Sequence, residues 1–194
     1  MSMRPMIYPV SSLEPIRKAI GSKDSSLVDR IADAYAKLYD REPDPESLDR
    51  VRKAGQSLVD GKSPTENEPG TWLEAIHFAA RGLGLLQSKY PVNEDWAWMA
   101  WLEYFEQAGE QLPSDARQFL QWLVEGRPFQ GPKAEADGAY YAGLESQEVE
   151  RLLDALAELH ECNPELATDI DGFGEELAAW LETCRGKALL VIAS

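Results

Sequence analysis

Residues 188–193 read ALLVIA and follow Gly186 and Lys187 near the end of the chain. They form a short, continuous apolar run that contains the β-branched residues Val191 and Ile192. A run of this length and composition, preceded by a glycine, is typical of a β-strand. The sequence therefore predicts a strand at residues 188–193.

A second strand is predicted near the other end of the chain. Residues 6–10, MIYPV, are mostly apolar, and Pro5 and Pro9 favour an edge position because proline has no N–H group to donate to a neighbouring strand. Residues 139–143, AYYAG, are a third candidate strand. These segments predict a small sheet made of both chain ends, with residues 139–143 as its third candidate member and helices packed against it.

The rest of the chain carries apolar residues at helical spacing, and start and stop signals divide it into eight predicted helices. The start signals are Ser12, Asp24 or Ser25, Asp44 with Pro45, a capping box of Thr71 and Glu74, Asn93, Pro113 with Ser114, and Ser146. Residues 161–172 are predicted to be rich in turns, and the last helix follows them and ends at Gly186. The predicted fold class is α+β and predominantly helical, with residues 1–194 in a single domain.

The predicted helix of residues 94–108 is the most apolar segment of the chain and contains Trp96, Trp98 and Trp101. A helix that is apolar around most of its girth is usually buried on several sides. Core packing is therefore the preferred interpretation, and an exposed aromatic binding groove is the alternative.

The chain is strongly acidic. Its 34 Asp and Glu residues against 19 Lys and Arg residues give a formal net charge of -15 and a sequence pI of about 4.5. Nucleic acids bind through clustered Lys and Arg, and the sequence has no basic run. We therefore expect neither nucleic acid nor an anionic membrane as a partner, whereas a basic protein is favoured by long-range attraction. Solubility alone is the simpler explanation of the same charge.

Several absences predict a cytoplasmic protein. Residues 1–10 contain Arg4, Pro5 and Pro9 and have no apolar segment of signal-peptide length. No stretch approaches the roughly 18 uninterrupted apolar residues typical of a membrane-spanning helix. Two cysteines, Cys162 and Cys184, are too few for a disulfide framework in a chain of this size.

Three short segments carry a resemblance to a known type of protein. They are the start of the chain, residues 3–10 followed by SLEPI at residues 12–16; its close, residues 186–192; and residues 141–144 before the predicted helix of residues 149–159. Together they resemble uncharacterised bacterial families of the YfbM-like type, which are domains of unknown function. The resemblance implies an α+β fold and a bacterial source. It implies no activity, because these families supply no catalytic residues to carry over.

The best catalytic candidates are His77, Glu74 and Arg127. His77 lies three residues after Glu74 and hence on the same face of a helix. A pair of an imidazole and a carboxylate can act as general-base machinery, although such a pair more often lies on the surface or holds a half-buried histidine. Arg127 is included because it follows a helix end in the longest irregular stretch of the chain.

The only candidate metal ligands are His160, Cys162 and Cys184. Zinc requires four ligands, or three and a water molecule, usually paired at short spacing. The chain offers two ligands within one turn and a distant thiol on the apolar side of a helix, so a buried structural Cys184 is the simpler interpretation. For a cysteine nucleophile, His160 would point away from Cys162. No metal and no cofactor are predicted.

Asp169, Asp171 and Gly172 resemble a fragment of a calcium-binding loop. An EF-hand loop requires a glutamate at its twelfth position, and the residue at that position, counted from Asp169, is Trp180. The other carboxylate runs fit a solvated surface.

Three functions fit these observations. The first is a non-catalytic binding protein, such as an inhibitor or immunity-type protein that neutralises a basic partner. The second is an enzyme with His and carboxylate chemistry around His77. The third is a structural subunit of an assembly, which would show a large exposed apolar patch. The sequence does not establish the oligomeric state, and the absence of catalytic motifs favours the first function.

Overall fold

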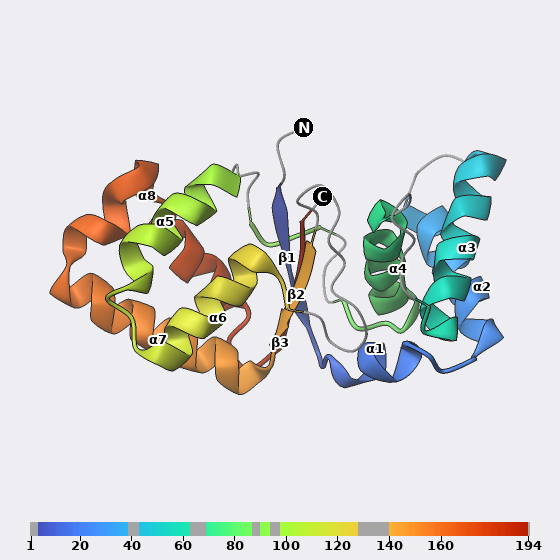
Figure 1. Cartoon of the computed structure of the whole chain (residues 1–194), viewed down its shortest axis with the longest axis horizontal. Helices are drawn as coiled ribbons and strands as arrows, with labels where there is room; N and C mark the ends of the chain where they lie inside the picture. Colours follow the sequence, from blue (N-terminus) through green and yellow to red (C-terminus); the bar gives the residue numbers. More distant parts are fainter. Residues whose placement is uncertain are drawn as a thin grey trace.

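In the computed structural model, two groups of helices cover the two faces of a small sheet (Figure 1). The structure describes residues 4–38, 43–62, 69–86, 90–93, 98–127 and 140–193, with the backbone alone at residues 69–72 and 74.

The central strand is β3 (Ala188–Ala193), the apolar run near the end of the chain. One edge of β3 pairs antiparallel with β1 (Pro5–Val10), and the other pairs antiparallel with β2 (Tyr140–Leu144). All residues of β3 are buried, which explains why the strand is apolar without alternation. The predicted sheet of both chain ends and a third strand is therefore confirmed.

Helices α1 to α4 cover one face of the sheet and helices α5 to α8 cover the other (Figure 1). The first layer comprises α1 (Glu14–Ala19), α2 (Ser25–Leu38), α3 (Pro45–Asp60) and α4 (Pro69–Gly82). The second comprises α5 (Trp98–Gly109), α6 (Ser114–Glu125), α7 (Ser146–Cys162) and α8 (Pro164–Thr183). The predicted α+β, mainly helical fold is confirmed. Among the described helices, none is long and apolar enough to cross a membrane.

Strand side chains alternate between two hydrophobic cores, one under each helical layer. Ile7 and Val191 lie opposite each other and belong to the core under α5 to α8. The next pair, Tyr8 and Leu190, belongs to the core under α1 to α4. Because opposite residues of an antiparallel pair share a face, β1 and β3 contribute matched pairs to both cores.

Several helix ends follow local signals as predicted. The side chain of Asp44 accepts a hydrogen bond from the backbone N–H of Ser47 at 2.9 Å, and Pro45 is the first residue of α3. Gly61 ends the same helix in the left-handed conformation, with a φ of 65°, which glycine adopts without steric cost.

Two predicted helix starts are wrong. Because α4 begins at Pro69, which can occupy a first turn without losing a hydrogen bond, Thr71 lies inside the helix and the predicted capping box does not begin it. The N-cap of α7 is Glu145 and not Ser146. Its side chain accepts the backbone N–H of Glu148, and the Glu148 carboxylate accepts the N–H of Glu145 at 2.8 Å.

The segment predicted to be rich in turns is mostly helical. α8 begins at Pro164, directly after α7, and its non-helical part is confined to residues 169–172. Ile170, Asp171 and Gly172 there have φ values of 58°, 55° and 87°. These left-handed residues bend the chain, and Gly174 then lies against Leu166 and Ala167 of the first half of α8.

Asn93 binds the outer edge of β1. Its Oδ1 accepts a hydrogen bond from the N–H of Ile7 at 2.7 Å, and its Nδ2 donates to the carbonyl of Pro5 at 2.7 Å. The N–H of Val92 donates to the carbonyl of Ile7 at 2.9 Å. These bonds occupy an edge that could otherwise pair with another chain. The residues that Asn93 is predicted to cap, 94–97, lie outside the described residues.

The described part of the Trp-rich helix packs largely as core. Trp101 and Tyr104 of α5 are buried, and the ring of Trp101 contacts those of Phe173 and Trp180 on α8. Met99, by contrast, is 66% exposed at the start of the same helix. The preference for core packing is confirmed for Trp101 and Tyr104, while Trp96 falls outside the described residues.

Candidate functional site

His77 lies on α4 where the helix packs on β1. The centroid of its ring is 4.9 Å from that of Tyr8 and 5.1 Å from that of Phe78. The side chain of Glu74, its predicted partner, is outside the described residues. The partner that the structure shows is Arg81, one turn further along α4.

Arg81 donates a hydrogen bond from Nε to Nε2 of His77 at 3.0 Å. Burial, and to a smaller degree the charge of Arg81, lowers the pKa of His77 to about 4. The imidazole is therefore neutral at pH 7, with Nε2 as the hydrogen-bond acceptor. A general base needs a free lone pair and a pKa near the working pH. His77 is therefore better placed to orient Arg81 than to act as a general base.

Arg81 also lines an open depression between α2 and α4, which we call the α2–α4 depression. It has a volume of about 320 Å³ and is lined by Arg30, Asp33, Ala34, Lys37 and Leu38 of α2 and by Arg81 and Gly82 of α4. A Cβ atom at position 82 would lie 3.0 Å from the carbonyl oxygen of Arg30. A glycine at this position therefore allows the close approach of the two helices beside the depression.

The half-buried His77 is expected to make folding stability depend on pH. Its pKa is about 4 in the folded chain and about 6.5 when unfolded, so only the unfolded chain takes up the proton between these values. Stability should therefore fall as the pH decreases from 6.5 to 4, by up to roughly 3 kcal/mol, and this contribution should level off below pH 4. Urea unfolding at several pH values measures the effect.

The matched variant is His77→Gln, which keeps an acceptor for Arg81 but does not titrate. Its free energy of unfolding should change less steeply between pH 6.5 and 4, because the titrating imidazole is gone. The carboxylates contribute equally in both proteins, so the difference in slope reports on His77 alone. Identical slopes for the two proteins would contradict the burial of a neutral imidazole at this position.

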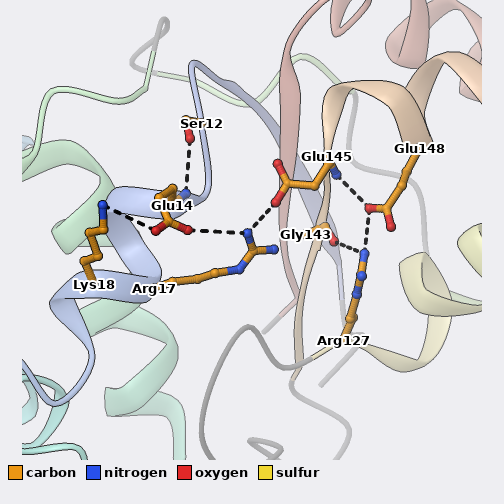
Figure 2. Close-up of polar contacts among 8 residues, drawn as sticks. All are labelled: Ser12, Glu14, Arg17, Lys18, Arg127, Gly143, Glu145 and Glu148. Carbon is orange, nitrogen blue, oxygen red and sulfur yellow. Dashed lines mark hydrogen bonds and ion pairs between the residues drawn. The ribbon is translucent and has the colours of Figure 1, made fainter.

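Arg127 belongs to a polar network beside the sheet (Figure 2). Its Nη1 lies 2.6 Å from a carboxylate oxygen of Glu148 and donates to the carbonyl of Gly143 at 3.3 Å. The guanidinium carbon lies 3.8 Å from the centroid of the Trp122 ring, within the range of a cation–π contact. Arg127 thus joins the end of α6 to β2 and to the start of α7.

The network continues from Glu148 to α1 in the other helical layer. Figure 2 shows Glu148 between Arg127 and the N–H of Glu145, while the Glu145 carboxylate points toward Arg17 and pairs with it. Arg17 also lies 4.0 Å from Glu14. The side chains of Arg17 and Glu145 are partly exposed, and partly exposed ion pairs contribute little to stability, whereas Glu148 is mostly buried and caps α7 as well. We interpret the network as a structural link between the layers.

The candidate metal ligands do not come together. His160 lies 2.7 Å from the hydroxyl of the buried Tyr104, and burial lowers its pKa, opposed by the charge of Glu175. Cys184 is buried, which raises the pKa of its thiol to about 11, and Cys162 is exposed. Within the described ranges there is no group of three or more His, Cys, Asp or Glu side chains that could hold a metal ion.

The net charge is distributed unevenly between the two helical layers, and no sequence motif marks this feature. Residues 1–97, which include α1 to α4, carry 13 Lys and Arg against 15 Asp and Glu. Residues 98–194, which include α5 to α8, carry 6 against 19. The charges of the two halves can be counted in the sequence, but only the fold shows that helices α1 to α4 form one layer and helices α5 to α8 the other (Figure 1).

The outward face of α5 carries part of this charge. Met99, Glu103 and Glu106 on the helix and Glu110 directly after it are all exposed. Their spacing of four, three and four residues places them on one side of the helix. No ion pair joins the three glutamates to any other residue that the structure describes. We call these four residues the acidic stripe.

Comparison of the chain with protein-family models, curated proteins and solved structures found no match. The resemblance of its termini to the YfbM-like families therefore stays a hypothesis. The fold and charge define an acidic α+β protein whose sheet lies between a nearly neutral and a strongly acidic helical layer.

Proposed function

We propose that the protein is a non-catalytic binding module that recognises a basic protein through the acidic stripe and the surrounding surface of α5 to α8. The main observation that supports this proposal is the concentration of negative charge in residues 98–194. The concrete form of the proposal is an inhibitor or immunity-type protein that neutralises a basic partner.

Charge on one side of a molecule has a physical consequence that evenly spread charge lacks. It attracts a basic partner and orients it before contact, which raises the association rate and makes that rate fall with salt. Met99 supports the same interpretation, because it places an exposed apolar side chain at one end of the acidic stripe. Flexible methionines of this kind adapt to the shape of a partner.

The two other functions have less support. An enzyme around His77 would need the lone pair that already accepts the hydrogen bond of Arg81. A subunit of an assembly would expose a broad apolar patch, and in the described part of the chain the large exposed apolar side chains are Tyr90 and Met99.

The test compares two variants that change the net charge equally. One reverses the acidic stripe (Glu103→Lys, Glu106→Lys and Glu110→Lys), and the other reverses three exposed carboxylates of the first layer (Asp29→Lys, Glu46→Lys and Asp49→Lys). Proteins captured from bacterial lysate by the unaltered chain at low salt are purified, and association rates are measured for all three forms.

We expect a basic partner whose association rate falls about tenfold or more for the stripe variant and much less for the first-layer variant. Higher salt should slow association with the unaltered chain. If the association rate fell equally in the two variants, the binding would be explained by non-specific attraction to the net charge, which would contradict recognition through the acidic stripe. Capture of no basic protein would overturn the proposal.

A further inference from the structure

The α2–α4 depression is a positively charged site on a strongly acidic protein. Among the described residues that line it, three are cations, Arg30, Lys37 and Arg81, and one is a carboxylate, Asp33. We propose that it binds a small organic phosphate. This site lies in the layer opposite the acidic stripe and does not depend on the proposed function.

The excess of cations in the depression matches a phosphate monoester. The described part of the lining carries two more positive than negative side chains, and a phosphate monoester carries about -1.5 to -2 charges at pH 7. Lys37 and Arg81 lie in the last turns of their helices, where the helix dipole alone favours cations. Arg30 lies in the middle of α2, so the dipole does not account for its presence.

His77 prepares Arg81 for an anionic ligand. The His77 ring accepts a hydrogen bond from the Nε of Arg81 at 3.0 Å, and this bond fixes the orientation of the guanidinium group at the edge of the depression. Tyr8 packs on the His77 ring, and its own ring lies 6.0 Å from the guanidinium carbon of Arg81. A cation held in place before binding loses less entropy when a ligand arrives.

The remaining groups are compatible with a ligand of this class. Arg30 pairs with Asp24 at 3.3 Å, but both side chains are about half exposed, so a phosphate can displace this pair at little cost. Ala34, Leu38 and Gly82 supply apolar lining beside the cations. The volume of about 320 Å³ is at the lower end of the range for ligand pockets and fits a small organic group.

The probe is phenyl phosphate, titrated into the isotope-labelled full chain at low ionic strength and followed by amide chemical shifts. Potassium chloride at matched ionic strength and phenol are the controls for screening and for the ring alone. We expect saturable shifts at residues 30–38 and 81–82 with phenyl phosphate, smaller ones at the same amides with inorganic phosphate, and neither pattern with the controls.

Three variants separate this site from general attraction. Arg81→Ala should weaken binding about tenfold or more, because it removes charge-assisted hydrogen bonds. The double variant Arg30→Gln with Lys37→Gln should do the same, and its exposed positions keep the test valid if Arg81→Ala does not fold. Arg117→Ala removes an exposed arginine from α6 in the other layer and should leave affinity unchanged.

Three results would overturn the proposal. They are the absence of saturable shifts, shifts that chloride or phenol reproduces, and equal weakening by Arg117→Ala and by the double variant. Saturable binding that only the depression variants weaken would support it.

Discussion

Replacement of Gly174 by alanine is expected to lower the free energy of unfolding by roughly 3 kcal/mol. An added Cβ atom would lie 2.8 Å from Cε2 of Tyr104, 2.9 Å from the carbonyl oxygen of Leu166 and 3.0 Å from Cα of Ala167. Two of these neighbours are backbone atoms of α8 itself, which cannot turn aside as a side chain can. Urea unfolding followed by tryptophan fluorescence measures the change.

The matched control is Gly55→Ala in α3. The three atoms nearest to an added Cβ atom there all belong to the side chain of Ile31, with the closest at 3.3 Å. The gain in helix propensity, about 1 kcal/mol, should offset most of this crowding. If the two variants were equally stable, the close approach of Gly174 to the first half of α8 would be contradicted.

The second large effect is expected for Leu190→Ala in β3, which should lower the free energy of unfolding by roughly 2–5 kcal/mol. Leu190 is fully buried in the core under α1 to α4. Tyr8 lies opposite it on β1 and Gly143 on β2, and the glycine has no side chain to fill the space that a shorter residue would leave. Chemical denaturation gives the size of the loss.

Met99→Ala is the control for this substitution, because it also shortens a large apolar side chain but at a position that is 66% exposed. Its effect should be within about 0.5 kcal/mol of zero. A loss as large as that for Leu190→Ala would show that Met99 is buried by contacts in solution. A small loss at Leu190 would contradict the central position of β3.

Much of the fold could be predicted because its signals are local. Residues 188–193 are apolar without alternation, as a strand buried on both faces must be. Asp44, Pro45 and Gly61 fix the ends of α3 through their own hydrogen bonds and backbone preferences. Such signals act within one turn of a helix or one strand, so they do not depend on the rest of the chain.

The errors in helix boundaries have a shared physical origin. Glu145 and Ser146 are adjacent and both carry oxygen atoms that can cap a helix. The distant Arg17 pairs with Glu145 in the folded chain, and Arg127 pairs with Glu148. Glu148 also supplies the second half of the capping box, so the N-cap lies at Glu145 among contacts that join residues far apart in the sequence.

The candidate site likewise depends on contacts between segments that are distant in the sequence. The sequence predicts a carboxylate neighbour, Glu74, for His77, whereas the described structure packs its ring against Tyr8 and directs its lone pair to the Nε–H of Arg81. The α2–α4 depression could not be predicted, since its cations come from two helices that are separated by α3 in the chain.

Composition and local periodicity are enough to predict the strands, the predominance of helices and the large negative charge. Three features become visible only in the folded chain: the sheet lies between two helical layers, most of the negative charge lies in one of them, and Arg30, Lys37 and Arg81 line one depression. These features depend on which distant segments pack together. That packing follows from burying apolar faces of every element at once, and no short stretch of the chain specifies it.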